Sequence, residues 1–167
     1  NEEFVMFLQP QVDYEGYPYG AEALVRWQHP KRGLLSPGIF IDALEKNGFV
    51  YRLDIYMWNK AAKQLSEWKK RGIEKYHISV NISTKDFYLI DVYETFTSLV
   101  EKYDISPKLL KLEITETALM SDLDKNILII KKLQDYGFDI EIDDFGSGYS
   151  SLNMLNQMKL DILKLDM

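Results

Sequence analysis

The sequence contains no cysteine and only two histidines among its 167 residues. Disulfide bonds and thiolate metal sites are therefore excluded, and a chain without cysteine fits a reducing compartment. Positive charge is also scarce, because 20 Lys and Arg residues stand against 26 Asp and Glu residues, giving a formal net charge of −6. A mildly acidic chain is a poor candidate for binding duplex DNA, which requires clustered positive charge.

Long apolar runs are absent as well. No stretch approaches the roughly 18 apolar residues that a membrane-crossing helix needs, so we expect no membrane contact by this segment and a cytoplasmic location. The chain begins at Asn1, with neither an initiator methionine nor a signal peptide, and stops at Met167. We expect both ends to have been cut from something longer.

Hydrophobic residues make up 46% of the chain and charged residues 28%, which is normal for one soluble globular domain. The first two predicted strands cover 4–12 and 20–27, with about seven residues between them. A parallel crossover needs a dozen or more residues, so this pair is predicted to be antiparallel. A loop is predicted over 29–33, and Ser36 is the predicted N-cap of a helix that ends at Gly48.

A longer helix is predicted over 52–71, where apolar residues recur at helical spacing, and its Trp58 and Trp68 are interpreted as core residues. Strands and helices then alternate. Further strands are predicted near 76–82, 109–115, 138–143 and 160–165, with helices near 91–103, 122–136 and 150–157. This alternation is typical of parallel strands joined by helical crossovers.

The four later strands share one pattern, in which apolar residues alternate with polar ones. The polar positions are Ser79 and Asn81, Lys111 and Glu113, Glu141 and Asp143, and Lys164 and Asp166. A sheet covered by helices on both faces would have nearly continuous apolar strands. One polar face instead favours a TIM-like (β/α) barrel with a polar interior, an antiparallel first strand and about six of the usual eight strands. The alternative is an open α/β sheet.

Reactive groups of such barrels gather at the carboxyl ends of the strands. Six polar residues fit that position or stand alone in an apolar strand: Glu22, Asn81, Glu113, Asp143, Asp144 and Lys164. Convergent carboxylates repel one another unless a cation lies among them, and an oxygen-rich set suits Mg²⁺, Mn²⁺ or Ca²⁺. The adjacent Asp143 and Asp144 could bridge two such ions for in-line displacement at a phosphate.

These residues also have ordinary structural explanations. A strand-end carboxylate is commonly a helix cap or a salt-bridge partner, and Lys164 fits either a neutralising role or the orientation of a water molecule. Gly146 and Gly148 fit a phosphate-cradling loop or a sharp bend. Ser150 and Ser151 lack a histidine partner, which favours a helix N-cap over a nucleophile.

Several ordered blocks together resemble the EAL-domain family of cyclic di-GMP phosphodiesterases. The signature is Glu22-Ala23-Leu24 within 22–30, and the other blocks are 9–10, 80–83, 112–117, 143–151 and 163–166. The resemblance implies that residues 1–167 are a partial EAL domain, the N-terminal two-thirds of the barrel. It further implies hydrolysis of cyclic di-GMP to linear pGpG in bacterial second-messenger signalling.

The resemblance also implies a site for two Mg²⁺ or Mn²⁺ ions. One ion would be bound by Glu22, Asn81, Glu113 and Asp143, and the second by Asp143 and Asp144. Lys164 would lie beside the attacking water, so the implied catalytic residues are Lys164, Glu22 and Asp144.

Substrate and partner contacts follow from the same resemblance. Gln9 and Arg26 match residues that contact the dinucleotide, and 144–151 matches a mobile loop that Glu116 anchors and that relates the site to a homodimer interface. A homodimer is therefore the expected assembly, and a GGDEF or sensor domain is a possible neighbour in the parent protein.

Two departures from the family pattern affect the functional prediction. Ser147 stands where Thr or Ala is common, and the chain stops before a glutamate after the seventh strand and a glutamine on the eighth. We therefore expect this piece to hydrolyse little and to associate through open sheet edges. The alternative function is a catalytically inactive cyclic di-GMP receptor or interaction module, but no carboxylate of the motif is lost within this span.

Overall fold

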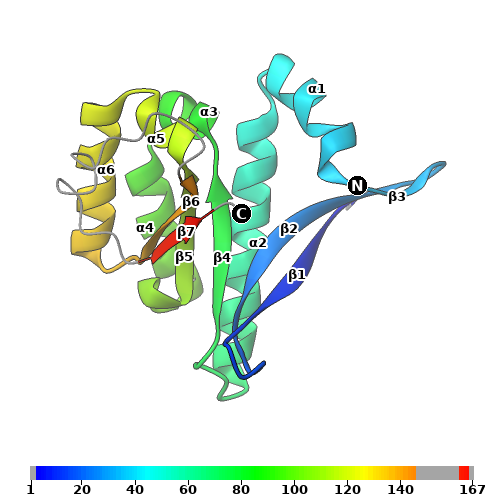
Figure 1. The fold of residues 1–167 in the computed structure, drawn as a ribbon. Helices are drawn as coiled ribbons and strands as arrows, with labels where there is room; N and C mark the ends of the chain where they lie inside the picture. The colour runs from blue at the N-terminus through cyan, green and yellow to red at the C-terminus, as the bar shows by residue number, and fades with distance from the viewer. Residues whose placement is uncertain (1–2, 146–161, 166–167) are drawn as a thin grey trace.

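The computed structural model describes residues 3–145 and 162–165, which form a sheet with helices beside it (Figure 1). The strands are β1 (Phe4–Val12), β2 (Pro18–His29), β3 (Gly33–Leu35), β4 (His77–Ile82), β5 (Leu110–Thr115), β6 (Ile140–Phe145) and β7 (Ile162–Leu165). The α-helices are α1 (Ile41–Lys46), α2 (Val50–Lys70), α3 (Thr84–Leu89), α4 (Val92–Tyr103), α5 (Glu116–Met120) and α6 (Leu123–Tyr136). Short 3₁₀ turns cover η1 (Pro37–Ile39) and η2 (Pro107–Leu109). None of the helices in this described part combines the length and apolar composition needed to cross a bilayer.

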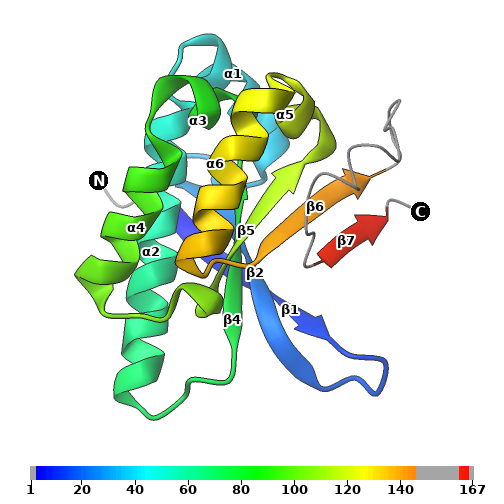
Figure 2. The same ribbon diagram turned by 90° about the vertical axis from the view of Figure 1, so that its left-hand side faces the viewer.

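The strand order is β1-β2-β4-β5-β6-β7, and β3 pairs with β2 beside this path. β1 and β2 are antiparallel, as the short connection predicted, and β2, β4, β5, β6 and β7 run parallel. Figure 2 shows α2, α4 and α6 on one side of these strands. Helices on one side only leave the other face of the sheet for polar side chains, as in the wall of a barrel.

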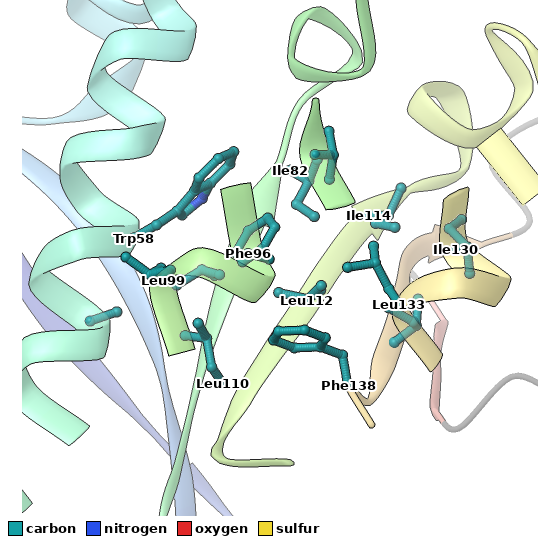
Figure 3. Close-up of a cluster of buried hydrophobic side chains, with 14 of the residues drawn as sticks. Trp58, Ile82, Phe96, Leu99, Leu110, Leu112, Ile114, Ile130, Leu133 and Phe138 are labelled. Atoms are coloured by element: carbon teal, nitrogen blue, oxygen red, sulfur yellow. The ribbon is translucent and has the colours of Figure 1, made fainter. Parts of the chain in front are cut away.

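The core lies between this helical layer and the sheet (Figure 3). The apolar members of β4, β5 and β6 belong to it, and each is at most 2% exposed: Ile78, Val80, Ile82, Leu110, Leu112, Ile114, Ile140 and Ile142. Trp58 of α2 and Phe96 of α4 pack there with ring centroids 4.5 Å apart. Trp58 is therefore a core residue as predicted, and Trp68 packs partly buried at the cluster's edge.

Three short elements were not predicted. α3 and α5 begin directly at the ends of β4 and β5, where Ser83 and Thr115 are the N-cap residues. Each is six residues or fewer, which is too short for helical periodicity to be visible in the sequence. β3 begins at Gly33, the last residue of the predicted loop, which adopts a φ of 73° and lets the chain turn back to pair with β2.

The helix predicted from Ser36 to Gly48 is broken. Ser36 stands at the N-cap position of η1 without a side-chain capping bond, and Phe40, with a φ of −129°, separates η1 from α1. Phe40 is only 4% exposed, because its ring packs with Phe4 and Trp27. The tertiary contact thus overrides the local helix signal. The predicted helix over 150–157 lies outside the described residues.

The polar face of the sheet contains a buried ion pair. Lys111 Nζ of β5 lies 3.2 Å from Glu141 Oε1 of β6, and Ser79 Oγ of β4 donates to Glu141 Oε2 at 3.1 Å. Their side chains are almost fully covered, with the lysine side chain 11% and the glutamate side chain 2% exposed. Three parallel strands are therefore joined by charge-assisted contacts on the face away from the helices.

A glycine makes room for the next layer of this face. Gly20 of β2 lies opposite His77 of β4, and the His77 ring covers the place where a Cβ would be. His77 Nε2 in turn lies 2.8 Å from Gln11 Oε1 of β1. The missing side chain at Gly20 thus lets a ring from β4 reach across β2 to β1.

We expect Lys111→Met to destabilise the fold by about 3–5 kcal/mol, because it removes the Lys111 ammonium group from the buried Glu141 carboxylate. The double variant Lys111→Met/Glu141→Gln should recover much of this loss, since no buried charge then stays uncompensated. Urea unfolding of the single and double variants measures the coupling. Equal losses in the single and double variants would contradict the ion pair.

We expect Gly20→Ala to cost about 1–3 kcal/mol, because the new methyl group must displace the hydrogen-bonded His77 ring. Gly38→Ala is the matched control, since a methyl group there meets no atom within 4 Å. Thermal unfolding of the two variants tests the difference. Gly20→Ala/His77→Ala should be closer to the parent than the two single losses combined.

Candidate functional site

The centre of the candidate site is a contact between β2 and β4. Asn81 Nδ2 donates a hydrogen bond of 3.0 Å to Glu22 Oε1, and these residues are 59 positions apart in the chain. Glu22 is half-buried and Asn81 is exposed. Glu113 of β5 lies directly opposite Asn81 in the parallel register and is only 2% exposed. Three of the predicted ligands are therefore placed on three neighbouring strands.

Asn81 is also fixed through its backbone. Trp58 Nε1 of α2 donates to the Asn81 carbonyl oxygen at 3.0 Å, and Trp58 is 1% exposed. The helix layer thus holds the main chain of Asn81 while Glu22 orients its side chain. This leaves the Asn81 amide oxygen, which donates nothing, as the group available to a cation.

The remaining predicted ligands lie on β6. Asp143 is half-buried and pairs in register with Thr115 of β5. Asp144 follows it in β6, and Lys164 lies in β7, but the side chains of both are outside the described part of the structure. Within residues 3–145 and 162–165, no three His, Asp or Glu side chains form a ready-made metal site. The metal-binding roles of these residues stay predictions.

The two predicted substrate-binding residues lie on the same face of the β1–β2 hairpin. Gln9 pairs with Glu22, and Arg26 pairs with Val5, so the period of two puts Gln9, Glu22 and Arg26 on one side. Arg26 Nη1 donates to its neighbouring carbonyl at Val25, and its guanidinium lies 5.7 Å from the centre of the Phe7 ring. A cation and a 45% exposed aromatic ring thus lie on the same face of the hairpin as Glu22.

Glu116 begins α5 immediately after β5. It is 4% exposed, and the preceding Thr115 caps the helix by accepting a hydrogen bond from the Ala118 N–H at 3.2 Å. The first turn of α5 therefore places the buried Glu116 directly at the end of β5. Of the loop that it is expected to anchor, 144–151, residues 146–151 lie outside the described residues, so this role also stays a prediction.

Sequence reasoning assigned no role to the layer beneath these candidates. Ser79, Lys111 and Glu141 lie two positions before Asn81, Glu113 and Asp143 on the same three strands. The alternation of polar residues placed them on this face, but it could not reveal that they contact one another. Asp54 and Asp86 were missed altogether, since nothing in their spacing marks them.

Both the sequence and the fold of this chain resemble those of known proteins. The family model of the EAL domain matches residues 1–167. The bifunctional diguanylate cyclase/cyclic di-GMP phosphodiesterase MucR of Pseudomonas aeruginosa is 34% identical over 165 residues, or 98% of this chain and 24% of that protein. The cyclic di-GMP phosphodiesterase PdeR of Escherichia coli is 30% identical over 166 residues, or 99% and 25%. The chain thus spans about a quarter of the length of these curated relatives.

Solved structures give the same result. The MucR phosphodiesterase in complex with c-di-GMP superposes with a TM-score of 0.93 at 34% identity, covering 98% of this chain and 67% of that one. The FimX EAL domain of Xanthomonas citri, at 22% identity, matches with a TM-score of 0.87 over 99% and 64%. The predicted TIM-like barrel, incomplete in this chain, is confirmed, and the alternative of a separate open α/β fold is wrong. The chain belongs to the EAL domain family.

Proposed function

We propose that the protein carrying this chain hydrolyses one phosphodiester bond of cyclic di-GMP and releases linear pGpG. The observation that carries the proposal is the Glu22–Asn81 hydrogen bond between β2 and β4, with the buried Glu113 beside it in register. Family membership supports the same reaction, because MucR and PdeR are named as cyclic di-GMP phosphodiesterases.

The donor set fits a hard divalent cation. Glu22, Asn81, Glu113 and Asp143 offer only carboxylate and amide oxygens, which Mg²⁺ and Mn²⁺ prefer. We propose that these four hold one ion and that Asp143 and Asp144 hold a second. Bound ions would supply a nucleophilic water and neutralise charge at the phosphate.

The chain's own residues then have separate tasks. Glu22 orients Asn81, to which it is already hydrogen-bonded. Gln9 and Arg26 contact the dinucleotide on the face they share with Glu22. We assign Lys164, with Glu22 and Asp144, to the catalytic group, with Lys164 positioning the attacking water.

Assembly and location complete the proposal. Glu116 anchors the loop that follows β6 and links the site to a homodimer, and a GGDEF or sensor domain flanks the barrel in the parent protein. A cytoplasmic location suits a chain without cysteine.

A turnover assay tests the reaction. The protein carrying this chain is incubated with cyclic di-GMP and Mg²⁺ or Mn²⁺, and chromatography separates substrate from pGpG. Accumulation of pGpG supports the proposal. Saturable binding of cyclic di-GMP without any product would instead identify a catalytically inactive receptor.

We expect Glu22→Ala to lower turnover by more than about 100-fold, since even outer-shell partners of metal ligands cost about 10–100-fold. The fold should persist, because Glu22 is only half-buried and lies in a carboxylate-rich site. Glu15→Ala, in the exposed turn of the same hairpin, is the matched control. Circular dichroism and initial rates of both variants are compared, and near-normal turnover of Glu22→Ala would make Glu22 a structural residue.

Metal exchange gives an independent prediction. Exhaustive chelation should abolish turnover, and Mg²⁺ or Mn²⁺ should restore it. Ca²⁺ should inhibit, because it takes more ligands at longer and more variable distances than Mg²⁺. Initial rates at fixed Mg²⁺ with increasing Ca²⁺ measure this competition, and full activity after chelation would contradict the metal requirement.

A further inference from the structure

Two carboxyl groups outside the site face each other behind β4. Asp54 lies in the second turn of α2, and Asp86 lies in the first turn of α3 and is 0% exposed. The two carboxyl groups lie close enough for each to shift the pKa of the other. A hydrogen bond between two carboxyl groups needs one proton, because two ionised carboxylates have none to donate.

The surroundings of the Asp54 and Asp86 carboxyl oxygens indicate that the two groups hold one proton. Asp86 Oδ2 accepts from the Ser83 backbone N–H at 2.7 Å and from the Ser83 hydroxyl at 2.8 Å. Among the residues that the structure describes, Asp54 Oδ2 and Asp86 Oδ1 are buried oxygens without a hydrogen-bond partner. A single proton between the two carboxyl groups satisfies both oxygens and removes one buried charge.

The pair is connected to the candidate site through β4. Ser83, which Asp86 binds twice, is two residues beyond Asn81. One turn after Asp54 on the same helix, Trp58 donates to the Asn81 carbonyl oxygen. Helix α2 therefore contacts the end of β4 at the Asn81 carbonyl and, through Asp54, lies against the Ser83–Asp86 cap that follows it.

We propose that Asp54 and Asp86 share one proton as an acid–carboxylate pair, and that this pair is a positioning device which fixes the end of β4 and with it Asn81. The proposal rests on the proposed function, since it gives Asn81 a metal to bind. Asp54 and Asp86 contact neither metal nor substrate.

The charges around the pair set the direction of its pH dependence. Burial, together with Asp86 on α3 and Glu45 on α1, raises the pKa of Asp54 from 3.8 to about 8, while the Ser83 hydrogen bond opposes this shift. Burial also raises the pKa of Asp86, against the hydrogen bonds from Ser83 and Asp54. The pKa of Asp54 is higher in the folded protein than in the unfolded chain. The contribution of the acid pair to folding stability is therefore fully present below about pH 4 and is lost as the pH rises to about 8.

Titration tests the shared proton. With aspartate labelled at its side-chain carboxyl carbon, NMR should show one carboxyl that stays protonated above pH 6 and ionises near pH 8. That signal should be missing in Asp54→Asn. The urea midpoint of the parent should fall between pH 5 and pH 8, while that of Asp54→Asn stays flatter, since an amide cannot ionise but can still donate to Asp86.

Manganese binding tests the positioning role. Mn²⁺ affinity, measured by electron paramagnetic resonance, should fall in the parent as the pH rises from 7 to 9, and Asp54→Asn should keep its affinity over that range. Asp54→Leu, which removes the hydrogen bond, should weaken Mn²⁺ binding about tenfold at pH 6, as loss of an outer-shell partner does. Asp42→Asn, at an exposed carboxylate on α1, should follow the parent at every pH.

Results that contradict the acid pair can be distinguished from results that contradict the proposed function. The absence of any carboxyl titrating above pH 6 would overturn the shared proton. Parallel loss of Mn²⁺ affinity in the parent and Asp54→Asn, or no Mn²⁺ binding at any pH, would overturn the positioning role. A protein that shows the expected titration and Mn²⁺ binding but makes no pGpG contradicts only the proposed reaction.

Discussion

The described part of the structure depends on one constraint, which is that charges buried on the inner face of the sheet need partners. The outer faces of β4, β5 and β6 are apolar and covered by α2, α4 and α6, so polar residues are confined to the other side. There Glu141 is 1% exposed and is held by an ammonium group and a hydroxyl from the two strands before it. An unpartnered carboxylate at that depth would cost more than the sheet could easily compensate.

This constraint produces layers along the strands. The deepest described layer contains the His77 ring above Gly20, and the next contains Lys111, Glu141 and Ser79. In those layers the charged and hydrogen-bonding side chains bind one another, so they stabilise the sheet beneath the candidate site. Two residues further along the strands, Asn81 contacts Glu22 and remains exposed, so this is the layer that is open to a ligand. Along the same alternating strands, one set of polar residues thus stabilises the sheet, and the set two positions later forms the candidate site.

The helices do more than cover the core. Trp58 uses its ring to fill the space against Phe96 and its indole N–H to bind the Asn81 carbonyl. Asp54, one turn earlier, lies close to Asp86, which caps α3 together with Ser83. The same helix therefore links the apolar core, the proposed acid pair and the candidate ligand on β4, which explains how the main chain of the exposed Asn81 is held at the strand end.

The sequence by itself determined the alternation of strands and helices, the antiparallel first pair and the sidedness of the polar residues, because these follow from periods of two and 3.6 and from connection lengths. It also determined the family, through ordered motifs around Glu22, Glu113 and Asp143. Only the tertiary structure decided that Lys111 pairs with Glu141, that Phe40 breaks the helix after Ser36, and that Asp54 meets Asp86. These contacts join residues that are distant in the sequence, and no local pattern encodes which side chains will meet when strands and helices pack.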